Sequence, residues 1–206
     1  MKRPNAFTLI EILVVVSVIG LLVAILVPAL GKARTQARRV TCATQLHQVA
    51  LAMTGYMQYN RDRMPQVSFM PSLGPAPLTN TIGNKPVYFA DVLKPYLKNG
   101  NALQCPEDQP NFSDRAAPNT GLSYFQSERS SYAYRLRLAG LTPTEFAQAT
   151  GGHHHHQGEQ DRDRKKQIPS NTIWFANDYN NFHGKAGQIG ARRYVYIDGH
   201  VSDFEN

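Results

Sequence analysis

The sequence predicts an α+β protein in which one long N-terminal helix packs on a small antiparallel β-sheet. Three observations favour this fold class. Residues 7–30 are almost uninterruptedly apolar, residues 31–62 have an amphipathic pattern, and two β-type segments flank Asp198-Gly199 near the C-terminus. Residues 63–206 should form one head domain, since about 140 residues suffice for a single core.

The first element, residues 7–30, has the length and composition of a membrane-spanning helix. Only three of its 24 residues are polar, Thr8, Glu11 and Ser17. A helix of this length spans about 36 Å, more than the hydrocarbon core of about 30 Å. Lys2 and Arg3 favour a cytoplasmic N-terminus, whereas the basic residues at 32–39 oppose that orientation.

Glu11 is unusual in such a segment. An ionisable residue inside a membrane span costs a few kcal/mol and usually has a partner or a function. A cleaved secretory signal peptide, cut near Ala29, or a plain signal anchor would not need it. The carboxylate follows Phe7 by four residues and therefore lies on the same helix face. We predict a functional role for Glu11.

Residues 2–11 read Lys-Arg-Pro-Asn-Ala-Phe-Thr-Leu-Ile-Glu. This segment resembles the class III signal of type IV prepilins and type II secretion pseudopilins. The resemblance implies that prepilin peptidase cuts between Ala6 and Phe7, removing residues 1–6 as a leader, and that the new amine of Phe7 is methylated. It also implies that Glu11 guides assembly. Ala6 stands where the family usually has Gly, although a small residue is kept.

The resemblance further implies a pilin fold, a location and a set of partners. The chain would be a single-pass protein of the bacterial inner membrane with a periplasmic or extracellular head. Its partners would be other pilin-like subunits, prepilin peptidase and the inner-membrane assembly platform. Pro28 stands where many pilins have a proline that kinks the helix. The implied function is a filament subunit, and the alternative is a minor subunit that binds cargo, a surface or DNA.

Residues 31–62 are predicted to continue the helix as an amphipathic stem lying on the sheet. Apolar residues recur at steps of three and four along one face. They are Ala33, Ala37, Val40, Ala43, Leu46, Ala50, Met53 and Met57. Asn60, Asp62 and Pro65 should end the helix.

The head is expected to begin with a loop over residues 64–85. The further predicted elements are a short helix at Val87–Leu97, ended by Asn99-Gly100, and strands at Ser131–Tyr134, Thr172–Ala176, Arg193–Ile197 and His200–Phe204. Asp198-Gly199 between the last two strands favours a tight hairpin.

Four short motifs of the stem and head resemble a subgroup of pilin-like proteins. They are a Cys in the stem (Cys42), Cys105-Pro106-Glu107-Asp108 after a short helix, Ser131-Tyr132-Ala133-Tyr134, and His183 followed by Asp198-Gly199. The last corresponds to the C-terminal His-spacer-Asp-Gly motif of the subgroup, and its spacer here is longer than usual.

Cys42 and Cys105 are the only cysteines of the chain. In an oxidising compartment they could form a disulfide, and closing a loop of about 60 residues is worth roughly 4 kcal/mol in the chain-entropy model. Two buried free thiols are the alternative. Both interpretations stay open at this point.

Composition and motifs do not favour an enzyme, a cofactor or a metal site. The formal net charge of +7 is scattered, so nucleic acid is a permitted partner that nothing singles out. His153, His154, His155 and His156 are consecutive and could be a tag or a metal ligand set, but adjacent residues rarely share one ion. A metal or hydrolytic site made of His183, Asp198, His200 and Asp178 lacks any compact motif such as HExxH, GxSxG or paired CxxC.

Overall fold

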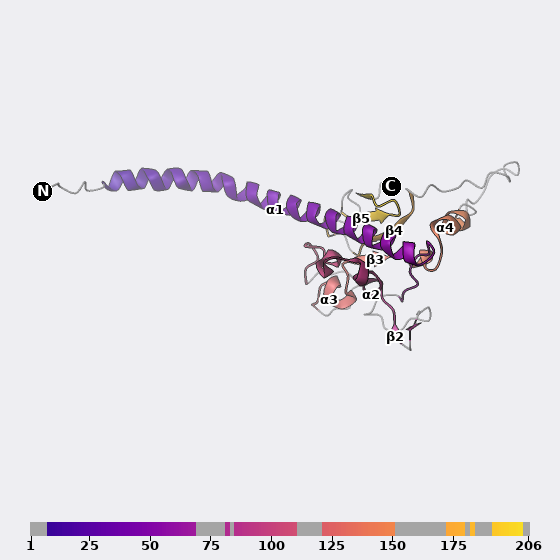
Figure 1. The fold of residues 1–206 in the computed structure, drawn as a ribbon. Helices are drawn as coiled ribbons and strands as arrows, with labels where there is room; N and C mark the ends of the chain where they lie inside the picture. Colours follow the sequence, from indigo (N-terminus) through magenta and orange to yellow (C-terminus); the bar gives the residue numbers. More distant parts are fainter. Residues whose placement is uncertain are drawn as a thin grey trace, which may run out of the picture. The chain divides into compact units, whose positions relative to one another are not determined.

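The computed structural model describes residues 8–68, 81–82, 85–110, 121–150, 172–179, 182–183 and 191–203. It divides into two compact units, residues 1–40 and 41–206. The order of helices and strands is shown in Figure 1 and confirms the predicted α+β class, with one long helix and a small antiparallel sheet.

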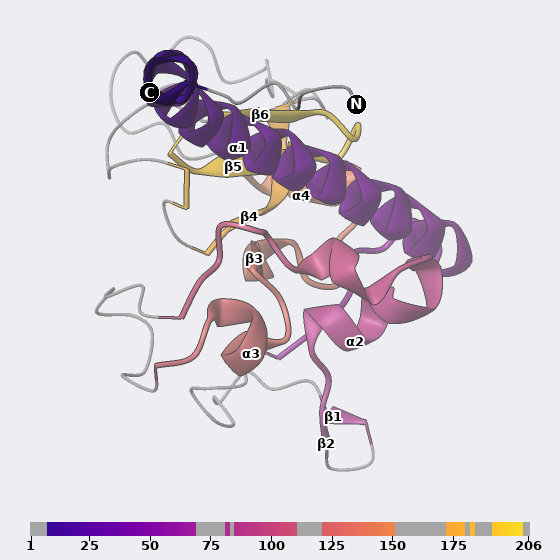
Figure 2. The same ribbon diagram turned by 90° about the vertical axis from the view of Figure 1, so that its left-hand side faces the viewer.

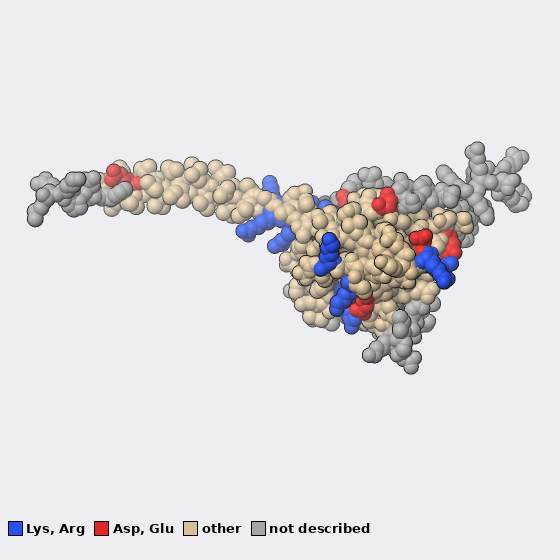
Figure 3. All heavy atoms as spheres, viewed as in Figure 1, with Lys and Arg blue, Asp and Glu red and all other residues tan. Residues whose placement is uncertain are grey.

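Helix α1 (Leu9–Tyr59) contributes most of the first unit. It is long and apolar enough to cross a membrane, with a mean hydropathy of 3.1 over its most apolar 18 residues. The large apolar side chains from Leu9 to Leu30 are 47% to 82% exposed. Figure 3 shows them as an uncharged stretch between acidic atoms near the helix start and the basic side chains that follow.

The helix runs without interruption through Pro28, which has no N–H to donate to the carbonyl of Ala24. The kink expected at this position stays a prediction.

In the second unit, α1 buries one stripe of side chains against the sheet. The stripe consists of Cys42, Leu46, Val49, Ala50, Ala52, Met53 and Met57. Four predicted stem positions are thereby confirmed, from Leu46 to Met57. The expected stripe began at Ala33, whereas residues 31–38 are exposed and the buried stripe begins only at Cys42. Figure 2 shows this part of α1 running across the sheet.

The end of α1 at Tyr59 agrees with the predicted stop signals. The amide of Asp62 donates to the carbonyl of Met57 at 2.9 Å, and both Arg61 and Asp62 adopt a left-handed conformation with φ of 56°. The chain therefore leaves the helix through a tight turn.

The four-stranded sheet has the order β3-β4-β5-β6 with antiparallel pairing throughout. Its strands are β3 (Tyr132–Tyr134), β4 (Trp174–Asp178), β5 (Arg193–Tyr196) and β6 (Val201–Asp203). The four predicted strands are confirmed to within one or two residues at their ends, and Phe204, the predicted end of the last strand, lies outside the described residues. Strand β4 ends at Asp178 rather than Ala176, because Asp178 pairs with Tyr132 across the ladder.

The remaining elements are short. Among the described residues they are β1 (Thr81–Ile82), β2 (Lys85–Pro86), α2 (Phe89–Leu93), α3 (Tyr124–Glu128), α4 (Pro143–Thr150) and the 3₁₀ turns η2 (Lys94–Tyr96), η3 (Gly100–Leu103) and η4 (Leu136–Leu138). The helix predicted at 87–97 is thus confirmed in its centre, and it tightens to a 3₁₀ turn where Pro95 removes a backbone donor. The loop predicted for residues 64–85 contains the small β1–β2 pair, whose short strands had no sequence signal.

Gly199 is required by the hairpin between β5 and β6. Its φ is +90° and its amide donates to the carbonyl of Tyr196 at 2.9 Å. We expect Gly199→Ala to destabilise the head by about 1–2 kcal/mol, since an L side chain is strained at this φ. The nearest atoms to an added Cβ lie 3.9 Å away, so the cost is conformational rather than steric.

Chemical denaturation of the detergent-solubilised chain measures this cost. Gly100→Ala is the matched control, because Gly100 has no positive φ and no atom within 4 Å of an added Cβ. Equal stability of the two variants would contradict the assignment of strain to Gly199.

Candidate functional site

The start of α1 is organised by Thr8 and Glu11. The Oε2 of Glu11 accepts the backbone N–H of Thr8 at 2.8 Å and its hydroxyl at 2.7 Å, and the amide of Glu11 faces the Thr8 hydroxyl oxygen at 3.4 Å. This is a capping box, in which a Thr and a Glu three residues later satisfy each other's backbone amides. The Thr-x-x-Glu spacing is the signal that could have revealed it. Ala6 and Phe7 lie outside the described residues.

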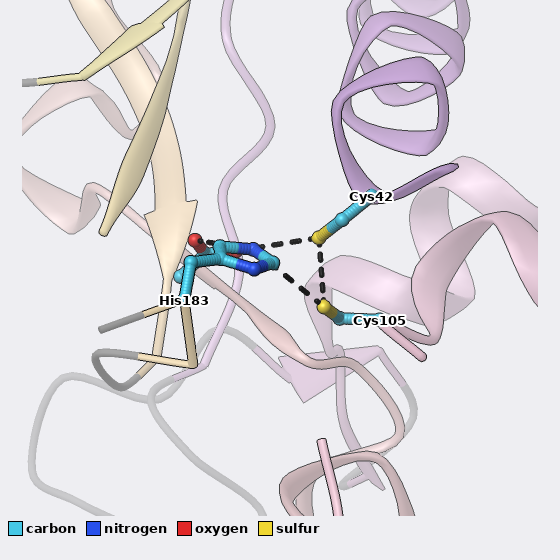
Figure 4. A group of neighbouring side chains, drawn as sticks. Cys42, Cys105 and His183 are labelled. Atoms are coloured by element: carbon cyan, nitrogen blue, oxygen red, sulfur yellow. Dashed lines mark hydrogen bonds and ion pairs between the residues drawn. The ribbon is translucent and has the colours of Figure 1, made fainter. Parts of the chain in front are cut away.

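A second group of chemically active side chains lies inside the head. One ligand atom each from Cys42, Cys105, Asp178 and His183 lies within 4.8 Å of all the others, and all four residues are buried. Figure 4 shows the sulfurs of Cys42 and Cys105 facing the ring of His183.

The distances within this buried cluster are short. The two sulfurs are 2.7 Å apart, and the Nε2 of His183 lies 3.9 Å from the sulfur of Cys105 and 3.5 Å from Oδ2 of Asp178. The sulfur of Cys42 lies 3.9 Å from Oδ1 of Asp178. Both cysteines are free thiols in the structure, so a disulfide between them stays a prediction.

Different elements supply the four side chains. Cys42 is the first buried residue of α1, Cys105 follows the 3₁₀ turn at Gly100–Leu103, and Asp178 ends β4. His183 follows β4 closely, and its amide donates to the carbonyl of Ala191 at 3.1 Å. The cluster is therefore assembled by tertiary packing.

Burial shapes the electrostatics of the cluster. The hydrogen bond with Cys105 and burial raise the pKa of the Cys42 thiol. Burial raises the pKa of Asp178 to about 7, against the opposing effects of the Arg193 backbone N–H and the positive charges of Arg193 and Arg192. Burial likewise raises the pKa of Tyr132, whose hydroxyl lies 3.3 Å from the sulfur of Cys42.

Asp108 is a buried organising residue next to this cluster. Its Oδ1 accepts the amide of Tyr124 at 3.0 Å, and its Oδ2 accepts the amide of Phe125 at 2.7 Å and the hydroxyl of Ser131 at 2.6 Å. The Ser131 oxygen in turn accepts the amide of Cys105 at 3.0 Å. These hydrogen bonds connect the Cys-Pro-x-Asp motif, through Cys105 and Asp108, to Ser131 of the Ser-Tyr-x-Tyr motif.

The C-terminal motif divides between two environments. His183 is buried beside Asp178, whereas Asp198 lies at the exposed hairpin turn and its Oδ1 is 2.6 Å from Nδ1 of His200. The carbonyl of Gly199 lies 2.9 Å from Nδ1 of His47 on α1. The four residues considered for catalysis thus do not form one site. His153–His156 lie outside the described residues.

Sequence reasoning paired Cys42 with Cys105 as a possible disulfide and singled out His183, but it did not place His183 beside the cysteines. It considered Asp178 only as part of the catalytic grouping. The signal that was available is the chemistry of the side chains, because Cys, His and Asp are all metal ligands.

Comparison with known proteins bears on the N-terminus. Residues 1–27 match the family described as the prokaryotic N-terminal methylation motif. No curated protein and no solved structure matches the chain. The methylation motif, the membrane-length apolar helix and the α+β head together support a type IV pilin-like or pseudopilin protein.

Proposed function

We propose that this chain is a structural subunit of a type IV pilus-like filament or a type II secretion pseudopilus. The observation that carries the proposal is the methylation motif at residues 1–27, which overlaps a helix whose apolar side chains from Leu9 to Leu30 are exposed in the single chain. A continuous exposed apolar surface needs a lipid or protein environment. In the membrane the environment is lipid, and in a filament it is the helices of neighbouring subunits.

Processing by prepilin peptidase precedes assembly in this proposal. The cut falls between Ala6 and Phe7 and leaves a positively charged, methylated amine at Phe7. The subunit then sits in the inner membrane as a single span, residues 7–30, with the head, residues 63–206, on the periplasmic side. The assembly platform of the inner membrane extracts it into the filament.

Glu11 supplies the charge that this amine needs. Its carboxylate is held at the start of the helix by Thr8, and Glu11 is the only charged residue between Phe7 and Gly31. In a packed bundle the carboxylate of one subunit neutralises the Phe7 amine of its neighbour. Two charges that are each costly in lipid become tolerable as a pair, and the pair fixes the axial register of the helices.

The N-terminus of the mature protein tests the proposal. Mass spectrometry of membrane-extracted protein should find a chain that begins at N-methyl-Phe7. Replacing Ala6 by Gly should leave this product unchanged, and Ala6→Trp should block its formation because the small residue before the cut is lost. An intact Met1 terminus in the unaltered chain, or a cut near Ala29, would show that the chain is not processed as a pilin.

A further inference from the structure

The buried cluster of Cys42, Cys105, Asp178 and His183 has the composition of a metal site. Two thiolates, one imidazole nitrogen and one carboxylate oxygen are the ligand types that zinc takes in four-coordinate protein sites. We propose that these four side chains bind one zinc ion inside the head, and that the ion is structural. The proposal is independent of the filament function.

The geometry of the cluster suits an ion of this size. Zinc–ligand bonds of about 2.0–2.3 Å in a tetrahedron give ligand–ligand separations of roughly 3.4–3.8 Å. Nε2 of His183 lies 3.5 Å from Oδ2 of Asp178 and 3.9 Å from the sulfur of Cys105, and the sulfur of Cys42 lies 3.9 Å from the other oxygen of Asp178, Oδ1. The ligand atoms that the four residues offer all lie within 4.8 Å of one another. The two sulfurs, now 2.7 Å apart, need to separate by about 1 Å.

A divalent ion would offset most of the charge of the deprotonated ligands. Two thiolates and the Asp178 carboxylate carry three negative charges, and a neutral His183 adds none. A divalent cation reduces the total to one, and the guanidinium groups of Arg192 and Arg193 lie close enough to act on Asp178. A bound cation would displace the thiol protons, and its charge would then offset the burial of the two thiolates and the carboxylate.

Groups around the cluster orient the ligands in the way that outer-shell partners do in zinc sites. The backbone N–H of Arg193 donates to Oδ2 of Asp178 at 2.8 Å and fixes the carboxylate. The hydroxyl of Tyr132 lies 3.3 Å from the sulfur of Cys42 and donates to Oε1 of Gln45 at 3.3 Å, so donation to a Cys42 thiolate would replace the bond to Gln45. The Ser131 oxygen holds the amide of Cys105 at 3.0 Å.

The site is closed, which assigns it a structural rather than a catalytic role. All four ligands are buried, so no coordination position opens to solvent. The ligands connect α1, the segment that follows the 3₁₀ turn at Gly100–Leu103, and the end of β4. A disulfide would use only Cys42 and Cys105, and it would give no reason for burying an imidazole and a carboxylate beside them.

Metal analysis of the full-length chain tests this proposal. The protein is extracted from membranes in detergent and purified without metal-affinity resin, and zinc is counted by mass spectrometry. We expect about one zinc per chain, falling at least tenfold in Cys42→Ser and in His183→Gln.

A matched control removes the other histidine-rich segment. Changing His153, His154, His155 and His156 together to Ala should leave the zinc content unchanged. If this variant loses the ion while His183→Gln keeps it, the zinc belongs to the histidine run and the proposed site is wrong.

A second readout does not depend on the folding of the variants. Cobalt exchanged into the unaltered chain should give thiolate-to-cobalt charge-transfer absorption and the visible bands of a tetrahedral ion. Removal of zinc by a chelator should lower the melting temperature by about 10 °C or more, reversibly on adding zinc back. Cobalt spectra without sulfur character would overturn the assignment of the ligands.

The oxidation state of the cysteines completes the test. Cells are quenched in acid and alkylated before lysis, and the peptides are mapped without reduction. Both cysteines should be recovered as alkylated thiols from zinc-loaded protein. A Cys42–Cys105 disulfide in the bulk of the quenched protein, with no zinc, would overturn the metal site and establish the bridge instead.

Discussion

Replacing Glu11 by Gln should deplete filaments at least 100-fold while leaving processed subunits in the membrane. Removing one partner of a buried charge pair costs about 3–5 kcal/mol, because the other charge stays buried and unpaired. Membrane insertion of the single subunit should be as efficient as in the unaltered chain or better, since a charge that is costly in lipid has gone. Immunoblots of sheared filament fractions and of membranes measure the two quantities.

The capping box makes Glu11→Gln a sharper test than Glu11→Ala. Gln can accept the amide and hydroxyl of Thr8 as Glu does, so the helix start is kept and only the charge is lost. Glu11→Ala removes both the helix cap and the negative charge. If Glu11→Gln assembles normally and Glu11→Ala does not, the carboxylate acts as a helix cap and the charge-pair mechanism is wrong. If either variant fails to insert in the membrane, the role of Glu11 precedes assembly.

Replacing Asp108 by Ala should destabilise the head by about 3–5 kcal/mol. The change leaves the amides of Tyr124 and Phe125 and the hydroxyl of Ser131 without their acceptor in a buried site, and each unmet donor costs about 1–3 kcal/mol. Chemical denaturation of the detergent-solubilised chain measures the free energy of unfolding.

Asp91→Ala is the matched control for Asp108→Ala. Asp91 also accepts charged hydrogen bonds, at 2.9 Å from Arg129, but its side chain is 45% exposed. An exposed ion pair is worth about 0–1 kcal/mol, so this variant should be nearly as stable as the unaltered chain. Similar losses for the two variants would mean that the Asp108 network contributes little.

The parts of the fold that the sequence predicted are those with a local signal. The apolar run and the three- and four-residue spacing predicted α1, and Asp198-Gly199 predicted the β5–β6 hairpin. The starts of two short helices, α3 and α4, also carry a local sequence signal, the capping box. Ser123 and Gln126 form a capping box at α3, and Thr142 and Glu145 do so at α4.

The buried cluster had no local signal, because its residues are joined only by packing. Cys42 and Asp178 are 136 residues apart in sequence, and Cys105 and His183 are 78 apart. The C-terminal motif pointed to His183 but paired it with Asp198, which lies at an exposed turn. Which carboxylate faces His183 is decided by where β4 ends, and the sequence predicted that end two residues too early.

The position of Cys42 on α1 has a mechanical consequence. It is the first buried residue of the helix, so the buried contact of α1 with the core of the head begins there. A pull on the N-terminal end of α1 therefore loads the joint between helix and sheet at Cys42 first, and peeling would proceed from there toward Met57. A zinc ion or a disulfide at Cys42 would lie where this separation begins. Its presence would therefore set the force at which α1 separates from the sheet.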